Sequence, residues 1–333
     1  MENNSPSKRD LVSVIIPTYN RAQLITETLN SVLQQTYQNL EIIVVDDGSN
    51  DNTEEIVKSI NDSRIAYYWQ ENSGLPASAR NLGISHADGD FIAFLDSDDI
   101  WLPNKLEIQL ALFEKRNDIL GICTNAILFP GKPRKFHQFQ NSQTITFKRL
   151  LKENLVINSS MVIRREVIED IGTLDEDKNF RAVEDYDYWL RMLQYRDYSI
   201  LIIKDILVKY RRHGTSVSER TSPKTIINIY WKKKKVLEKF TNEHKSDVQN
   251  TLRHDLSIAI LAALNSLGKL KRIGRFYFVK FRDIKLIHKI TMLFAIILKV
   301  LTRVLGKKEL PSRLLTKVKL NCILRLLHEI NFV

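Results

Sequence analysis

The chain has 333 residues, of which 44% are hydrophobic and 27% charged, and these proportions are typical of a folded protein and exclude a disordered one. Its net charge of +11 is unevenly spread, because residues 220–333 hold 25 Lys and Arg against 7 Asp and Glu, whereas residues 1–219 hold 25 against 32. The two cysteines, Cys123 and Cys322, match no metal-binding or redox spacing, which excludes a disulfide scaffold and favours a reducing compartment.

The first ten residues are polar and have no apolar segment of the kind found in signal peptides. We therefore expect residues 1–10 to form a disordered tail and the protein to be cytoplasmic.

Strand and helix patterns alternate four times in the first hundred residues. Continuous apolar runs predict buried strands, and apolar residues at helical spacing predict helices between them. The predicted strands are 12–17, 41–45, 65–69 and 91–95, and the predicted helices are 22–35, 52–60 and 74–86. Pro17 is expected to end the first strand, because proline cannot continue a central ladder. Together with the mixed pattern of the second half of the chain, this alternation predicts a Rossmann-like, doubly wound mixed α/β sheet, in which ligands bind beyond the carboxyl ends of the strands.

The second half of the chain has a mixed pattern. It predicts a helix at 103–116, a strand at 121–129, a basic loop at 130–143, a strand at 160–163, a helix at 184–195 and a strand at 199–210. Helical spacing then continues at 223–240, 246–267, 283–305 and 311–330. We therefore predict a domain at 11–218, made of two halves at 11–100 and 101–218, followed by a basic helical extension at 219–333.

Three carboxylates, Asp96, Asp98 and Asp99, follow the predicted strand 91–95. Such a cluster is costly unless a cation or hydrogen-bond donors compensate its charge. Alternate residues of an extended segment point the same way, so Asp96 and Asp98 can reach one Mg²⁺ or Mn²⁺ ion. The alternative is a solvated acidic turn that precedes the next helix.

The basic extension indicates an anionic partner. Its most apolar stretch, 290–298, lies between Lys289 and Lys299 and is too short to span a membrane. Helical spacing with abundant Lys and Arg favours helices that lie on an anionic membrane surface. Packing on the body of the protein or on another subunit remains an alternative, and nucleic acid binding is the least favoured partner.

Six short motifs resemble those of family 2 glycosyltransferases, in the order and at the spacing of that family, over about residues 10–218. They are Val14-Ile15-Ile16-Pro17-Thr18-Tyr19-Asn20-Arg21, Val44-Val45-Asp46-Asp47-Gly48-Ser49, Ala79-Arg80-Asn81-Leu82-Gly83, Leu95-Asp96-Ser97-Asp98-Asp99, Glu184-Asp185-Tyr186-Asp187 and Tyr210-Arg211-Arg212-His213. The resemblance implies a GT-A fold, a nucleotide-diphosphate sugar donor, a divalent metal ion and inversion at the anomeric carbon. It also implies that residues 11–100 form a nucleotide-binding half and residues 101–218 an acceptor half.

The resemblance also implies roles for individual residues. The donor-binding residues would be Pro17, Thr18, Tyr19, Asn20, Asp46, Asp47, Arg80, Asp96 and Ser97. Asp98, Asp96 and His213 would hold Mn²⁺ or Mg²⁺. Asp185 would be the general base, with Glu184 beside it, and two adjacent carboxylates raise one another's pKa.

Each assignment has a structural alternative. Arg80 could be a solvated residue on the exposed face of a helix. Glu184 and Asp185 could be the acidic residues common at a helix N-terminus, and Asp99 could be a helix cap. Trp189 is compatible with a sugar-stacking side chain or with a core residue.

The expected function is transfer of a single sugar from a UDP-sugar to a glycan or polyprenyl-linked acceptor at the inner face of the cell membrane, a hexosyltransferase activity. The chain lacks the Gln-x-x-Arg-Trp signature of processive members, which favours one addition per encounter.

A sugar-nucleotide nucleotidyltransferase would need a glycine-rich turn after the first strand, where residues 18–21 contain no glycine. A dinucleotide oxidoreductase is excluded because no G-x-G-x-x-G follows a strand. A non-enzymatic assembly protein that binds membrane or nucleic acid would leave the acidic cluster unexplained.

Overall fold

The structure is a computed structural model that describes residues 10–195, 198–212 and 223–265. The chain divides into two compact units, residues 1–216 and 217–333. Every predicted site residue except His213 lies in the described part of the first unit; His213 lies outside the described residues.

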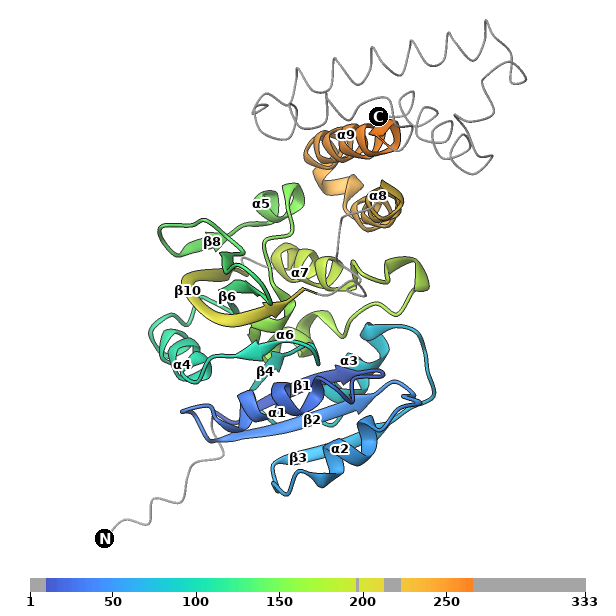
Figure 1. The fold of residues 1–333 in the computed structure, drawn as a ribbon. Coiled ribbons are helices and arrows are strands. Elements are labelled where there is room, and N and C mark those ends of the chain that lie inside the picture. The colour runs from blue at the N-terminus through green and yellow to red at the C-terminus, as the bar shows by residue number, and fades with distance from the viewer. Residues whose placement is uncertain (1–9, 196–197, 213–222, 266–333) are drawn as a thin grey trace, which may run out of the picture. The chain divides into compact units, whose positions relative to one another are not determined.

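The first unit is built on one mixed sheet of ten strands in the order β3-β2-β1-β4-β9-β6-β10-β5, with β7 paired to β6 and β8 paired to β10 (Figure 1). The strands are β1 Val12–Thr18, β2 Leu40–Asp46, β3 Ile65–Trp69, β4 Phe91–Phe94, β5 Ile100–Trp101, β6 Gly121–Phe129, β7 Arg134–Lys135, β8 Gln143–Ile145, β9 Val162–Arg164 and β10 Ile200–Arg211. Strands β3, β2, β1 and β4 are parallel, whereas β9 runs antiparallel to both β4 and β6. The predicted doubly wound, mixed α/β sheet is confirmed.

Helices cover the sheet of the first unit. They are α1 Ile25–Leu33, α2 Thr53–Ser59, α3 Pro76–Ser85, α4 Lys105–Lys115, α5 Phe147–Lys152, α6 Glu166–Ile171 and α7 Glu184–Gln194, with 3₁₀ turns η1 at Asn158–Ser160 and η2 at Lys178–Phe180. Val14 and Ile16 of β1 join the core that α1 covers. Ile15 points to the opposite face, where α3 packs closely because residue 83 is glycine: a Cβ there would lie 2.6 Å from Cγ2 of Ile15. This close approach places the preceding turn of α3, with Arg80, against the sheet.

Three predicted boundaries are wrong. Strand β1 continues through Pro17 to Thr18. Leu95 N–H donates to Ile15 O, so the backbone polar groups of Ile15, and of Pro17 two residues later, point toward β4. Strand β4 ends before it reaches Pro17, so the missing N–H of this proline costs no hydrogen bond in the ladder. The predicted strand at 160–163 is the turn η1 followed by β9. The predicted loop at 130–143 contains β7, whose pairing with β6 the loop's Gly and Pro residues obscured.

The described part of the second unit consists of α8, Pro223–Glu238, and α9, Thr241–Asn265. Helix α8 is close to the predicted 223–240, whereas α9 begins at Thr241, before the predicted start of the helix 246–267. Lys233 Nζ of α8 lies 2.7 Å from Asp255 Oδ2 of α9. Burial raises the pKa of Asp255, but Lys233 and His254 outweigh it and the net shift is downward. Among the described residues no helix is long and apolar enough to cross a membrane. The helices predicted at 283–305 and 311–330 lie outside the described residues.

Candidate active site

The ends of β1, β2 and β4 meet at one edge of the sheet. Thr18 pairs with Asp46, and Ile15 pairs with Phe94, two residues before Asp96. The three motifs that follow these strands are therefore neighbours, as expected from a parallel sheet.

The turn after β1 is tied to the turn after β2. Asn20 has a left-handed backbone (φ 51°), its N–H donates to Ser49 Oγ at 2.7 Å, and its Oδ1 accepts from Asn50 N–H at 2.8 Å. The side-chain oxygen of Asn20 is thus hydrogen-bonded within the protein. Thr18 and Tyr19 differ: the Thr18 hydroxyl is buried without a partner among the described residues, and the Tyr19 side chain is 43% exposed. Their contact with a donor stays a prediction, which the partnerless Thr18 hydroxyl and the exposure of Tyr19 favour.

The two carboxylates at the end of β2, Asp46 and Asp47, are buried and hold the surrounding loops. Asp46 accepts from Ser49 N–H and from Tyr67 Oη, both at 2.8 Å. Burial and this carboxylate raise the pKa of Tyr67. Asp47 accepts four hydrogen bonds from residues 70–74, namely from Gln70 Nε2, Ser73 N–H, Ser73 Oγ and Gly74 N–H. A carboxylate has about four lone-pair positions, so these four bonds use the accepting capacity of Asp47. Both residues support the surrounding loops in this structure. Direct contact with a nucleoside stays a prediction.

Arg80 links the acidic cluster to α7. Its Nη2 donates to Asp96 Oδ1 at 2.8 Å and its Nη1 donates to Glu184 Oε1 at 2.9 Å, although Glu184 is 104 residues away in sequence. Burial lowers the pKa of the Arg80 guanidinium, but Asp96 and Glu184 outweigh it and raise the pKa. The alternative of a solvated helix face is excluded, since Arg80 is buried.

The acidic cluster has one buried and two partly exposed carboxylates. Asp96 and Asp98 are partly exposed, and Asp98 Oδ2 lies 3.7 Å from Arg21 Nη2. Ser97, between them, is buried. In the described part of the chain no three His, Cys, Asp or Glu residues are grouped as a metal site. Two accessible carboxylates are nevertheless a donor set that fits Mg²⁺ or Mn²⁺, since these ions commonly use one or two carboxylates and take other ligands from phosphate and water.

Asp99 joins β10 to the acidic cluster. Its Oδ1 accepts from Arg211 N–H at 2.7 Å, and Arg211 Nε donates to Asp98 O at 2.7 Å. Burial, followed by the charges of Asp98 and Asp96, holds the pKa of Asp99 well above its ordinary value. Asp99 thus fixes the shape of the turn that presents Asp98.

The turn η1 supports Asp96 from a distant part of the first unit, and sequence reasoning missed it. Asp96 N–H donates to Ser159 Oγ at 3.1 Å, and Asn158 Nδ2 donates to Asp96 Oδ1 at 3.3 Å. Ser159 O in turn accepts from Trp101 Nε1 at 2.6 Å. A run of Asn and Ser is typical of any turn, so the sequence contained no signal for this contact.

Replacing Ser159 tests this support. Ser159→Ala leaves the Asp96 N–H without an acceptor, and we expect a loss of about 1–3 kcal/mol of stability and a raised donor KM, since Asp96 is no longer held. Ser160→Ala is the matched control, because Ser160 is equally buried but its hydroxyl bonds Ile157 O and Thr124 N–H. Urea unfolding and donor kinetics check this. Equal donor KM values in the two variants would contradict the role of Ser159.

Asp185 lies in the first turn of α7, next to Glu184. It is partly exposed, and its Oδ1 accepts from Tyr186 N–H at 2.7 Å. Desolvation and then the charge of Glu184 raise the pKa of Asp185 to about 7, against the opposing effect of Arg80. A carboxylate with this pKa can accept a proton near neutral pH. Trp189, one turn later, is buried and packs edge-on against Phe94 with ring centroids 5.8 Å apart, so it is a core residue.

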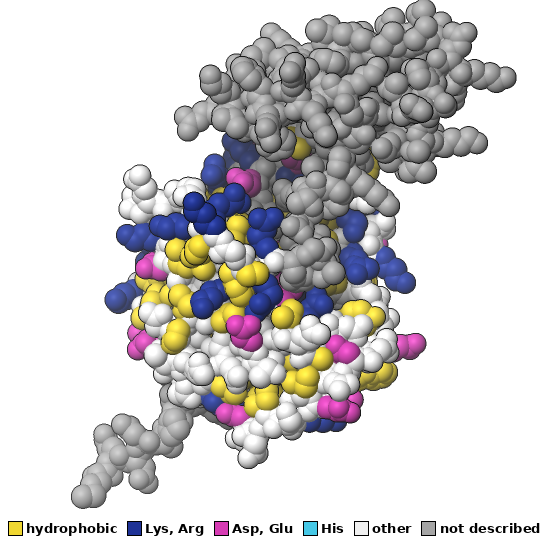
Figure 2. All heavy atoms as spheres, viewed as in Figure 1, with side chains coloured by type: hydrophobic (Ala, Val, Ile, Leu, Met, Phe, Trp, Pro, Cys, Tyr) yellow, Lys and Arg dark blue, Asp and Glu magenta, His cyan; other side chains and the backbone are white. Residues whose placement is uncertain are grey.

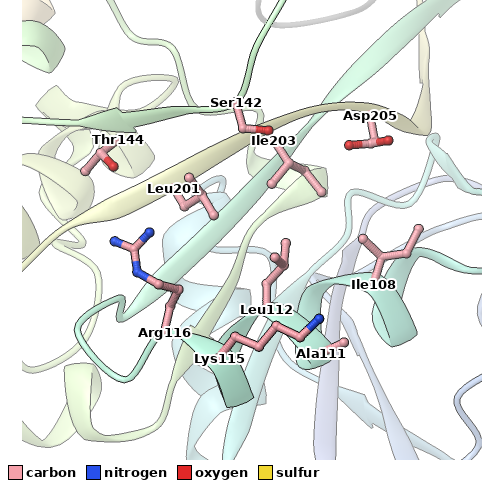
Figure 3. A pocket seen from close by; sticks show the side chains of 10 residues that line it. All are labelled: Ile108, Ala111, Leu112, Lys115, Arg116, Ser142, Thr144, Leu201, Ile203 and Asp205. Atoms are coloured by element: carbon pink, nitrogen blue, oxygen red, sulfur yellow. The ribbon is translucent and has the colours of Figure 1, made fainter.

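A groove of about 600 Å³ lies away from these residues, between α4 and strands β8 and β10 (Figure 3). Its lining includes the apolar side chains of Leu112, Leu201 and Ile203 and the cationic side chains of Lys115 and Arg116. None of the predicted site residues lines it.

Comparisons with known proteins place the chain in a family. The model of Glycosyl transferase family 2 matches residues 13–172. Escherichia coli WfgD, a UDP-Glc:alpha-D-GlcNAc-diphosphoundecaprenol beta-1,3-glucosyltransferase, is 38% identical over 214 residues, which cover 62% of this chain and 79% of WfgD. Bacillus subtilis TuaG, a putative teichuronic acid biosynthesis glycosyltransferase, is 32% identical over 213 residues, which cover 63% of this chain and 82% of TuaG. The match with an uncharacterized glycosyltransferase of Rickettsia typhi, 35% identical over 216 residues, spans 66% of that protein.

Solved structures show the same fold at lower identity. S. aureus TarS 1–349 in complex with UDP-GlcNAc has a TM-score of 0.54 and 22% identity, covering 86% of this chain and 91% of that one. The mannosyltransferase PcManGT from Pyrobaculum calidifontis, in complex with GDP-Man and Mn²⁺, has a TM-score of 0.55 and 17% identity, covering 97% and 88%. The mixed α/β sheet of this chain is thus shared with these glycosyltransferases and is consistent with the predicted GT-A fold.

The chain belongs to glycosyltransferase family 2. It is an enzyme, a nucleotide-sugar-dependent glycosyltransferase. The alternatives of a nucleotidyltransferase and of a non-enzymatic assembly protein are therefore excluded.

Proposed function

We propose that the protein transfers one hexose from a UDP-sugar to a hydroxyl of a lipid-linked glycan, by a single displacement with inversion. The choice of donor and acceptor is supported by the 38% identity with WfgD, whose name specifies UDP-Glc and a diphosphoundecaprenol-linked acceptor. The absence of a Gln-x-x-Arg-Trp sequence supports a single addition.

The observation that carries the proposal is the Arg80 bridge between Asp96 and Glu184. It holds the acidic cluster and the first turn of α7 on either side of one guanidinium. A donor at the cluster would then face Asp185, which in our proposal removes the proton of the acceptor hydroxyl as that oxygen attacks the anomeric carbon. Single displacement needs one base and no enzyme nucleophile.

Asp98 and Asp96 would hold Mn²⁺ or Mg²⁺, with His213 as a further candidate outside the described residues. When bound, such an ion neutralises charge on the departing nucleotide diphosphate. Thr18 and Tyr19 would contact the nucleoside, Ser97 would line the donor site, and Asp46, Asp47 and Asn20 would shape the pocket from behind.

A panel of nucleotide sugars assayed with Mn²⁺ tests these roles. We expect Asp98→Ala to weaken metal-dependent donor binding, because a metal ligand is lost. Asp185→Ala should bind donor normally but fail to transfer the sugar, because the base is lost. Equal donor turnover by the wild type and both variants would refute the assignments.

We also propose that residues 219–333 hold the enzyme against an anionic membrane, at the inner face of the cell membrane. The net charge of +18 that residues 220–333 carry supports this proposal. Some lysines of α8 have internal partners: Lys233 pairs with Asp255, and Lys234 lies 5.6 Å from the Trp231 ring centroid. Flotation with anionic vesicles, with and without residues 283–333, tests this docking, and failure of both forms to float would refute it.

A further inference from the structure

One segment of the catalytic unit is rich in Lys and Arg. Residues 130–152 contain six Lys and Arg and no Asp or Glu, although residues 1–219 as a whole have a net charge of −7. All six cationic side chains are exposed. We call them the cationic surface: Lys132, Arg134, Lys135, Lys148, Arg149 and Lys152.

The fold brings the two halves of this surface together through a buried histidine. The amide of Asn125 accepts from His137 N–H at 3.0 Å and donates to His137 O at 2.9 Å. The ring of His137 then hydrogen-bonds Leu155 O at 2.9 Å, so the chain after β7 meets the chain after α5. Lys and Arg side chains gather on the face of the molecule over α5 and β8, interleaved with hydrophobic side chains (Figure 2).

Helix α5 is amphipathic over its short length. Phe147, Leu150 and Leu151 are buried, whereas Lys148, Arg149 and Lys152 are exposed. Phe136, next to the other three cations, is 41% exposed and its ring lies edge-on to Tyr210 at 5.6 Å. Exposed aromatic rings among Lys and Arg are typical of surfaces that lie at a lipid headgroup layer.

The cationic surface is connected to the acceptor side of the active site. Tyr186, the residue after Asp185, donates from its hydroxyl to Leu151 O of α5 at 2.9 Å. At the other end, Phe129 O, just before the β6–β7 turn, accepts from Arg212 N–H at 2.7 Å, one residue beyond the Arg211 that contacts Asp99. Both halves of the surface thus adjoin elements that position the catalytic carboxylates.

We propose that the cationic surface, together with Phe136, docks on an anionic lipid bilayer and turns the acceptor side of the site toward it. The occupant is a bilayer because six exposed cations spread over two elements complement a sheet of negative charge, and the exposed ring adds apolar contact. The inference rests on the proposed lipid-linked acceptor and adds a second membrane contact, within the catalytic unit itself.

A fluorophore placed on the surface tests the proposal in the full chain. Cys123 is buried, so with Cys322→Ser a single added cysteine takes a polarity-sensitive label. Lys132→Cys reports on the cationic surface. Lys58→Cys, on α2 at the far end of the same unit (Figure 1), is the matched control, with an exposed lysine side chain. With vesicles containing phosphatidylglycerol we expect a blue shift, and quenching by doxyl-labelled lipid, at position 132 and not at position 58.

A charge variant makes the test quantitative. Arg134→Gln, Arg149→Gln and Lys152→Gln together should weaken partitioning on the order of 10- to 100-fold, because each cation near an anionic bilayer contributes to binding. Vesicles that bind the full chain without a signal at position 132 would overturn the proposal, as would unchanged partitioning of the charge variant. A signal with inorganic pyrophosphate alone would also overturn it, since the surface would then bind the acceptor's phosphates.

Transfer to a detergent-solubilised lipid-linked acceptor tests the proposed function separately, because no bilayer is present. If this transfer persists while the label at position 132 does not respond, only the docking surface is refuted. If transfer fails with every lipid-linked acceptor while the label responds, the proposed function is refuted.

Discussion

Asp185→Asn is expected to lower kcat by about 10²- to 10⁴-fold, which is the range that a general base contributes. Asparagine keeps the size of the side chain and can accept from Tyr186 N–H as Asp185 does, but it cannot take a proton from the acceptor. Donor affinity should therefore stay close to that of the wild type. Pre-steady-state transfer assays and calorimetric UDP titrations check the two expectations, and a variant with near-normal kcat would exclude Asp185 as the base.

The pH dependence follows from the raised pKa of Asp185, about 7. In the wild type kcat/KM should fall as pH drops through this pKa, because the base becomes protonated. Asp187→Asn is the control, since Asp187 lies in the same turn but its Oδ2 pairs with Arg191 Nε at 3.0 Å. That variant should keep the acidic limb of the profile, whereas Asp185→Asn should lose it.

Stability should change in the opposite direction to activity. Between the ordinary pKa of 3.8 and the folded value of about 7, the folded protein binds more protons than the unfolded chain, so this group makes stability fall as pH rises through that window. Asp185→Asn has no charge to desolvate. It should be about 1–3 kcal/mol more stable than the wild type at about pH 8, and the difference should vanish at about pH 4. Denaturant unfolding at the two pH values measures this.

Arg80→Met is expected to lower the free energy of unfolding by about 3–5 kcal/mol, because it leaves Glu184 buried and charged without its partner. It also frees Asp96 from the guanidinium, so activity should fall with stability. Chemical denaturation and transfer assays measure the two effects.

The double variant Arg80→Met with Glu184→Gln is the control for this interpretation. Since the neutral glutamine side chain needs no cation, the double variant should regain a large part of the stability without regaining activity. If Arg80→Met were within about 1 kcal/mol of the wild type, the ion-pair bridge would not be the link between the two halves of the site.

The sequence was sufficient to predict the edge at which the site forms. Thr18, Asp46 and Asp96 each follow a predicted strand, and the ends of such strands come together in a parallel sheet, so the neighbourhood of these residues follows from local patterns. The element types followed for the same reason, while boundaries failed where tertiary pairing decides, as at Pro17 and β7.

What the sequence could not supply are the partners across long separations. Arg80 and Glu184 are 104 residues apart, and Asp99 and Arg211 are 112 apart. Ser159 supports Asp96 from a turn without any distinctive sequence. The hydrogen bonds that Asp46 and Asp47 accept depend on how the side chains of residues 67–73 pack, and no local spacing encodes that packing.

The most direct test is a crystal structure with UDP and Mn²⁺, with anomalous data collected at the manganese edge. We predict an anomalous peak in contact with the Asp98 carboxylate and with the diphosphate of UDP, on the side of the acidic cluster that faces Asp185. A manganese peak or a diphosphate bound away from Asp96 and Asp98 would contradict the proposed roles of the acidic cluster.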